Sequence, residues 1–202
     1  MKRKLVALMA LLASLSLAQS TDTHNVTVNI PQVLKLTLDA TNYVFNFGSS
    51  ASGTVSVNSV NYPRASLTAY ETFLAGSDTT QDFAPSAVTG GTGDAYGTLE
   101  IVTNQSAWTV KINSIGDGGD GDLPLGYDRI KVYAYKAGGK GDSQTSGPTS
   151  IAASLELAKA NSGGQGKSTY HLYYLFKMNI NDDIPTTGLN DITTINLVLT
   201  AP

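Results

Sequence analysis

The chain has 202 residues, contains no cysteine, and carries 13 Lys and Arg residues against 16 Asp and Glu residues. This length is enough to bury one core as a single domain, and the lack of cysteine excludes both disulfide bonds and an anchor on a lipidated cysteine. Three of the 13 basic residues are Lys2, Arg3 and Lys4, which leaves 10 against 16 acidic residues beyond position 18, and this acidic balance argues against nucleic acid or another polyanion as a partner.

The first eighteen residues have the pattern of a secretory signal peptide. The basic residues at positions 2–4 precede an uncharged apolar run from Leu5 to Leu17, and the run closes on Ser16-Leu17-Ala18. We predict a signal peptide over residues 1–18, cleaved between Ala18 and Gln19. The run is too short for a transmembrane helix, and no charged stop-transfer cluster follows it. We therefore expect an extracytoplasmic protein, secreted, on the cell surface or in the periplasm, with one domain over residues 19–202 and no membrane span in the mature chain.

Apolar and polar residues alternate near the start of the mature chain. Val26, Val28 and Ile30 share one face, and apolar residues take the even positions again from 34 to 38. A period of two predicts β-strand, and Pro31 between the two runs cannot donate a ladder hydrogen bond. We expect two short collinear strands or one long edge strand with a break. The first part either pairs within its own sheet or completes the sheet of a neighbouring copy, which would be self-association through Val26 to Ile30.

Further strands are expected in chain order. Alternation predicts strands at residues 43–47, 55–57 and 130–134, a weak strand at 66–70 followed by a long surface loop from 76 to 94, and an element of ambiguous type at 151–160. Two hairpins are also expected. One joins 99–101 to 108–112 through a short turn, and the other joins 170–180 to 195–199 through the turn residues 181–188.

Short strands, frequent turn residues and little helix describe an all-β fold. We predict an antiparallel, Ig-like β-sandwich of about eight to ten strands. Its core should come from the more apolar face of each alternating run. The expected core residues are Leu36, Phe45, Leu99, Ile101, Trp108, Val110, Phe176, Leu197 and Leu199.

Side chains for acid–base or nucleophilic catalysis are scarce. The two histidines are His24, close to the new N-terminus, and His171, on a strand and without a recognisable partner spacing. The sequence holds no G-x-S-x-G nucleophile elbow and no H-E-x-x-H helix. We therefore predict that the protein is not an enzyme.

One loop has the composition of a cation site. Asp117, Asp120 and Asp122 alternate with glycines in residues 116–122, and three carboxylates on such a backbone can converge on Ca²⁺. The spacing departs from the EF-hand pattern, and Gly and Asp also suit any exposed turn. The loop is thus either a calcium site or a solvated connector, and no other cofactor is expected.

Tyrosine is the other candidate for binding. The chain has 10 tyrosines, and Tyr133, Tyr135 and Tyr173 fall on strand faces. A row of exposed rings can stack on the faces of sugars. Large amphipathic rings also suit strands and cover their neighbours without any ligand.

Two stretches carry a resemblance to a known family. Residues 99–112, LEIVTNQSAWTVKI, resemble the Trp-bearing hairpin of WxL-like bacterial secreted surface β-sandwiches. Residues 183–188, DIPTTG, followed by 195–202, INLVLTAP, are similar to the turn and final strand of such domains and of several fimbrial and coat-type secreted domains. Val110 stands where the motif has Leu, and residues 195–197 hold no tryptophan. The resemblance implies a secreted, sandwich-shaped, non-enzymatic surface protein and supplies no ligand.

Export, composition and fold class together indicate a function. We expect an exported, non-catalytic structural or adhesive component of the bacterial cell envelope or extracellular matrix, whose partners are other envelope or matrix proteins or surface glycans. The alternative is a calcium-dependent carbohydrate-binding module that uses the Asp loop and the tyrosine rings.

Overall fold

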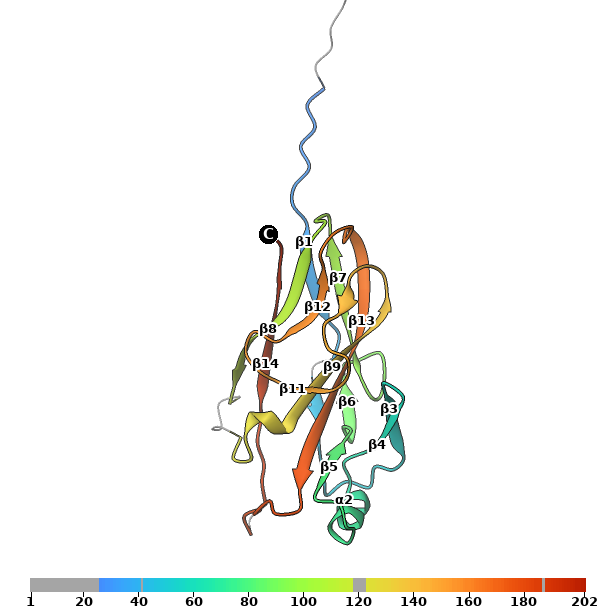
Figure 1. Ribbon diagram of the computed structural model, residues 1–202, viewed down its shortest axis with the longest axis vertical. Coiled ribbons are helices and arrows are strands. Elements are labelled where there is room, and N and C mark those ends of the chain that lie inside the picture. The colour runs from blue at the N-terminus through green and yellow to red at the C-terminus, as the bar shows by residue number, and fades with distance from the viewer. Residues whose placement is uncertain (1–25, 41, 118–122, 187) are drawn as a thin grey trace, which may run out of the picture. The chain divides into compact units, whose positions relative to one another are not determined.

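The structure is a computed structural model that describes residues 26–40, 42–117, 123–186 and 188–202. The chain divides into two units, Met1–Pro31 and Gln32–Pro202. The second unit consists mostly of β-strands with one short α-helix in its described part, and its strands pair antiparallel (Figure 1). The prediction of a β-rich antiparallel fold is confirmed. Among the described residues, no helix combines the length and the apolar character needed to cross a bilayer.

The larger sheet has six strands. Their spatial order is β1 (Leu34–Leu38), β7 (Gly97–Thr103), β13 (Gly166–Asn179), β9 (Ile130–Gly138) and β11 (Thr149–Ser150), and β5 (Thr80–Phe83) also pairs with β13. The register places Leu36 opposite Ile101 and Tyr170 opposite Leu99. β13 pairs with β7 along its first half and with β5 at its end, so this long strand holds the sheet together.

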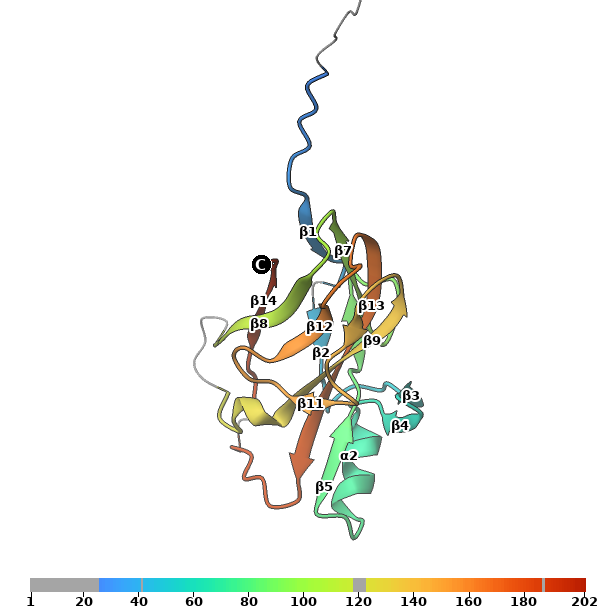
Figure 2. The same ribbon diagram turned by 45° about the horizontal axis from the view of Figure 1, so that its top comes forward.

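The smaller sheet has four strands, and two strand pairs stand apart from both sheets. The order of the smaller sheet is β10 (Asp142–Ser143), β12 (Glu156–Ala160), β8 (Trp108–Gly116) and β14 (Thr194–Thr200). The separate pairs are β2 (Asn42–Val44) with β6 (Ala87–Thr89) and β3 (Thr54–Val57) with β4 (Val60–Pro63). Two short helical elements complete the unit, the α-helix α2 (Leu67–Leu74) and the 3₁₀-helix η1 (Tyr127–Arg129). Figure 2 shows α2 beside β5, at the end of the unit away from β1.

One core contains side chains from both sheets. β7 and the first half of β8 bury every second residue, as a strand with one covered face must. Leu99 and Ile101 of β7 share a single buried cluster with Val110 of β8 and Leu172 of β13. The predicted core residues Leu99, Ile101, Trp108, Val110 and Phe176 are all buried. Burial of these apolar faces is the main stabilising contribution in a chain without disulfide bonds.

Trp108 is the largest side chain in this core. It is 1% exposed, its indole N–H donates to the carbonyl of Gly164 (2.9 Å), and its ring meets Tyr170 edge-on at 6.5 Å between centroids. Both Gly164 and Gly141 lie against the indole: a Cβ would come within 2.5 Å of the ring at Gly164 and within 2.7 Å at Gly141. The backbone therefore packs directly on the tryptophan.

Neither expected hairpin forms, so these two predictions are wrong. β7 pairs with β1 and β13 in the larger sheet, whereas β8 pairs with β12 and β14 in the smaller one. β13 and β14 likewise belong to different sheets. Alternation shows which face of a strand is buried, but it does not identify the neighbouring strand. The connection from Thr103 to Trp108 crosses between the sheets, so both strands turn their apolar faces toward the same core.

The region from 66 to 94 differs most from expectation. The predicted weak strand at 66–70 is wrong, because α2 begins there and Ser66 accepts a hydrogen bond from the N–H of Ala69 (3.2 Å) as its N-cap. The predicted loop from 76 to 94 instead contains β5 and β6. The ambiguous segment 151–160 contains β12, a strand. These elements are short, and their pairing depends on strands far away in the chain.

The described part of the first unit, residues 26–31, contains no strand. The expected strand over residues 26–30 is therefore wrong, and regular pairing begins only at Leu34 in β1. Val26, Val28 and Ile30 are 84%, 71% and 75% exposed. Three alternating apolar side chains are thus left uncovered.

We expect Trp108→Ala to lower the free energy of unfolding by about 3–5 kcal/mol, because it removes a fully buried ring and leaves a cavity. Urea unfolding followed by circular dichroism measures the change. Trp108→Phe is the control, since it keeps an aromatic ring and loses the bond to Gly164, and we expect it to cost clearly less than the alanine variant. A loss below about 1 kcal/mol for the alanine variant would contradict the burial of this side chain.

Candidate functional site

The two sheets each end in a strand that the core covers only in part. β1 is the terminal strand of the larger sheet and β14 of the smaller one. Every residue of both strands is at least partly exposed, in contrast to the neighbouring β7 and β8. The predicted core residues Leu36, Leu197 and Leu199 pack against the core here without being fully buried. β1 and β14 lie near each other, and the side chains along these edges are covered only in part.

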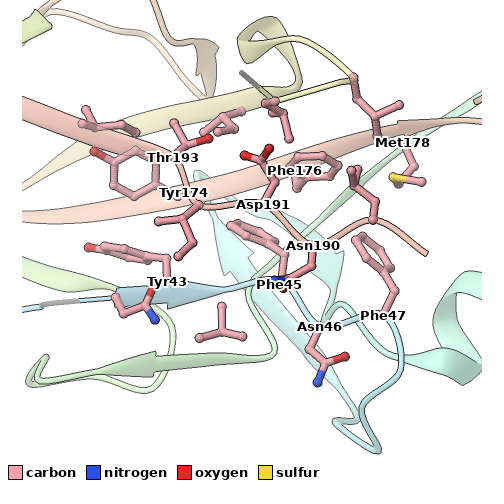
Figure 3. Close-up of a pocket in the computed structure, with 18 of the residues that line it drawn as sticks. Tyr43, Phe45, Asn46, Phe47, Tyr174, Phe176, Met178, Asn190, Asp191 and Thr193 are labelled. Carbon is pink, nitrogen blue, oxygen red and sulfur yellow. The ribbon is translucent and has the colours of Figure 1, made fainter. Parts of the chain in front are cut away.

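An apolar groove lies beyond the end of β1. Its volume is about 950 Å³, and β2, residues 45–48, β13 and residues 189–195 line it. Figure 3 shows Tyr174, Phe176 and Met178 from alternate positions of β13. We call this feature the edge groove and these three side chains its floor.

Aromatic rings from one stretch of chain form a wall of the edge groove. Tyr43, Phe45 and Phe47 alternate along residues 43–47, and all three are only half-buried. Tyr43 meets Tyr174 edge-on at 4.7 Å between centroids, and Phe45 lies 5.8 Å from Phe176. Phe45 was predicted to belong to the core, and it packs against the core while one side faces the groove. The alternation of these aromatic residues could be read from the sequence, whereas the partial exposure of their rings could not.

Tyr43 also ties this wall to the larger sheet. Its hydroxyl donates to the carbonyl of Leu172 and accepts from the N–H of Gly97, each at 2.9 Å. Burial raises the pKa of Tyr43 above its usual range, so the hydroxyl stays protonated at neutral pH. Hydrogen bonds as well as ring packing therefore hold the wall in place.

A buried ion pair holds the turn after β13. The guanidinium of Arg129 contacts both carboxylate oxygens of Asp182, at 2.7 and 3.1 Å, and the same carboxylate accepts from the N–H of Asn179 (2.7 Å). The Asp182 side chain is almost fully buried. Bidentate geometry of this kind restricts the position of both partners. The end of the groove floor, at Met178, is therefore anchored from its neighbouring turn.

The lining of the edge groove suits an apolar or peptide-like ligand. Asp191 is the single charged residue among its described lining residues, and the others are apolar side chains, amides and hydroxyls. Within the described ranges, no three His, Asp or Glu side chains gather in a way that could hold a metal ion. Among the described residues that line the groove, Asp191 has no second acid–base side chain beside it.

The structure describes only part of the predicted cation loop. Asp117 lies just beyond the end of β8, and Asp120 and Asp122 lie outside the described residues. The calcium interpretation and the connector interpretation therefore both stay predictions. His24 also lies outside the described residues.

The predicted tyrosines meet on the outer face of the larger sheet. His171 stacks on Tyr96 with 4.1 Å between ring centroids, and Tyr135 lies 6.1 Å from His171. Tyr96 also contacts Tyr173, at 5.1 Å. Tyr133 is buried, whereas Tyr135 is 49% exposed. Tyr96 follows a Gly/Asp-rich stretch, which is why periodicity did not single it out.

The rings of this outer face largely cover one another. Tyr133 shares a buried cluster with Leu175 and with Val55 and Val57 of the β3–β4 pair, so that pair covers part of the face. The rings of Tyr96 and Tyr135 pack against the imidazole of His171. Tyr135 remains the ring with the largest free surface here.

Comparison with known proteins adds no relative. No family model matches the chain, and neither a curated protein nor a solved structure shows significant similarity to it. The resemblance to WxL-like domains therefore depends on the sequence motifs quoted above.

Acid should destabilise the protein through His171. Burial lowers the pKa of this imidazole, and the carboxylate of Asp39 partly offsets the effect. Because the unfolded chain binds a proton near pH 6.5 and the folded chain only at lower pH, the free energy of unfolding should fall as the pH drops below about 6.5. Urea unfolding between pH 5 and pH 8, alongside an NMR titration of the ring, measures this.

His171→Gln is the control for this pH dependence. Glutamine does not titrate, so the variant lacks the contribution of the residue at position 171, and we expect its stability curve to be flatter between about pH 5 and pH 7 than that of the unaltered chain. An imidazole that titrates at or above pH 6.5 in the folded protein would contradict the assignment.

Proposed function

We propose that the protein is an exported, non-catalytic structural or adhesive component of the bacterial cell envelope or extracellular matrix. The observation that carries this proposal is that one small chain has both an apolar groove at its sheet edges and an exposed apolar segment at residues 26–30. Large exposed apolar surfaces on a soluble protein mark sites of contact with other proteins. Other envelope or matrix proteins are the partners that such surfaces suit.

The arrangement of the sheets supports an Ig-like β-sandwich. Two antiparallel sheets contribute side chains to one core, and consecutive strands β7 and β8 lie in different sheets. Sandwiches use such crossings between sheets and bury the inner face of each. Domains of this architecture commonly serve as modules of surface and extracellular proteins.

The chemistry of the described residues supports a binding role over an enzymatic one. The edge groove is apolar, and the one described histidine packs among tyrosine rings. Export follows from the basic and apolar pattern of residues 1–18. Because the chain has no disulfide bonds, the stability of its fold depends on the burial of apolar side chains and on sheet pairing.

A calcium-dependent carbohydrate-binding module is the second candidate. The observation in its favour is the outer aromatic face, where Tyr135 exposes about half of its surface next to His171 and its stacked partner Tyr96. Exposed tyrosine rings can stack on sugar faces. In this candidate, Asp117, Asp120 and Asp122 would supply the ligands for Ca²⁺.

The location of the protein tests the first proposal. We expect the chain in the envelope or matrix fraction of the cells that make it, beginning at Gln19 by mass spectrometry of the intact protein. Immunogold labelling should place it outside the inner membrane. A cytoplasmic chain that keeps residues 1–18 would contradict the proposal. So would purified protein with substrate turnover that His171→Gln abolishes.

Sugar binding separates the two candidates. On glycan arrays and by calorimetry, with and without Ca²⁺, we expect no saturable binding by the structural component. The carbohydrate-binding alternative requires binding that is lost on replacing Asp117, Asp120 and Asp122 with Asn, and reduced by Tyr135→Ala. Thr109→Ala, at a half-buried position of the smaller sheet, is the matched control for a substitution away from both features.

A further inference from the structure

We propose that Tyr135 is an oxidative cross-linking site, at which two copies of the chain are joined by a carbon–carbon bond between their Tyr135 rings. This inference deepens the proposed function, and it rests on that function only for the setting outside the cytoplasm. Exported proteins commonly form disulfide bonds there, which a chain without cysteine cannot do. A phenol ring is the oxidisable group that this chain offers in place of a thiol.

Tyr135 is the one tyrosine whose side chain is exposed. All 10 tyrosines lie in the described part of the chain, and every other one is buried or half-buried. Tyr135 is 49% exposed. Two rings from different molecules must touch edge to edge before a bond can form between them, so a ring covered by its own chain reacts poorly with another chain. The exposure of the tyrosines therefore selects one position.

The other side chains that oxidants attack most readily are covered or absent. The chain has no cysteine, and Trp108 and Met178 are 1% and 3% exposed. The remaining methionines, Met1 and Met9, belong to the predicted signal peptide. Oxidation of a side chain depends on its accessibility. A one-electron oxidant that meets the folded mature chain therefore reacts first at Tyr135.

The position of Tyr135 on β9 leaves room for a second ring. β11 pairs only with Lys131 and Val132 of β9, so among the described strands the stretch from Tyr133 onward pairs on one side, with β13. The ring neighbours of Tyr135 are His171, opposite it on β13, and Tyr133 on its own strand, at 6.1 and 6.4 Å between centroids. A second ring can approach from the unpaired edge of β9.

Contacts between rings connect Tyr135 to the covered tyrosines of the same face. His171 stacks on Tyr96 at 4.1 Å, and Tyr96 lies 5.1 Å from Tyr173. Electrons tunnel readily between rings this close, so an electron hole formed on one ring can move to another. Burial raises the pKa of Tyr173, so this phenol holds its proton more strongly than a phenol in water. The radical therefore settles on Tyr135, where water accepts the proton.

The oxidant is hydrogen peroxide, used by a peroxidase that removes one electron at a time. Each Tyr135 phenol loses one electron and one proton, and the two phenoxyl radicals join through the ring carbons next to their C–O bonds. Each of these carbons then gives up its proton and the oxygen of the same ring gains one, which restores both phenols. The two electrons and two protons lost in the first step reduce one hydrogen peroxide to two water molecules.

One reactive ring per chain determines the product. A chain that has used its Tyr135 has no second exposed tyrosine, so the reaction joins two copies and then stops. Both copies contribute the same residue, as in a two-fold symmetric dimer. We therefore expect a covalent dimer and no larger multimers.

Oxidation of the purified protein tests the proposal. The full chain is expressed, exported and purified, and then treated with hydrogen peroxide and a haem peroxidase. We expect a dimer on denaturing gels, with the fluorescence of dityrosine and with the mass of two chains less two hydrogen atoms. Peptide mapping by mass spectrometry should show that the bond joins Tyr135 to Tyr135. Protein that stays monomeric under these conditions would overturn the proposal.

Two phenylalanine variants form a matched pair. Tyr135→Phe and Tyr173→Phe each keep the ring and remove one hydroxyl from the same aromatic face, and thermal unfolding should show that both variants fold. Tyr135→Phe should lose nearly all of the dimer. Tyr173→Phe should keep most of it, because this half-buried ring is not the one that couples. Dimer that survives Tyr135→Phe, equal losses in the two variants, or multimers beyond the dimer would each overturn the proposal.

Protein from the cells that make it separates this inference from the proposed function. We expect it to contain peptides linked from Tyr135 to Tyr135 without added oxidant. Unlinked protein throughout, or links from Tyr135 to other proteins only, would overturn the cross-linking of two copies even if the protein lies in the envelope or matrix. Conversely, protein found only in the cytoplasm would overturn the proposed function, and the products of the purified chain would still decide the reactivity of Tyr135.

Discussion

β13 pairs with three other strands and turns every second side chain inward, into the main core of the second unit. Tyr170 and Leu172, in its first half, are fully buried within the core that Trp108 fills. Farther along, Tyr174, Phe176 and Met178 form the floor of the edge groove. A single alternating strand thus supplies both the core around Trp108 and the buried side chains that lie beneath the edge groove.

The difference between the two halves lies in what covers them. β8 and β12 of the smaller sheet contribute fully buried side chains over the first half. The second half is covered by half-buried rings of residues 43–47 and by the chain that leads into β14. Because apolar side chains gain stability in proportion to the area removed from water, half-buried rings retain a driving force for further burial. This is the physical reason to look for a partner at the groove.

Uncovered edges are normally a hazard for β-proteins. Natural sheets protect them with charge, proline, bulges or covering loops, since a bare edge pairs with whatever strand it meets. Here β14 carries no charged residue, and the alternation of residues 26–30 is likewise uncharged. β14 therefore lacks the charge that protects many such edges. The outer aromatic face is a weaker candidate, because its rings already cover one another.

The sequence determined which residues turn inward. Period-two alternation correctly placed Leu99, Ile101, Trp108, Val110 and Phe176 in the core, because inward or outward orientation is a local property of the pleat. Only the tertiary structure decided which strands are neighbours. β7 and β8 were expected to pair, but they lie in different sheets. Phe45 and Leu197 were expected in the core, but both are partly exposed. Strand pairing is settled by competition among edges far apart in the chain, so the position of the groove, which depends on where pairing stops, could not be read from alternation alone.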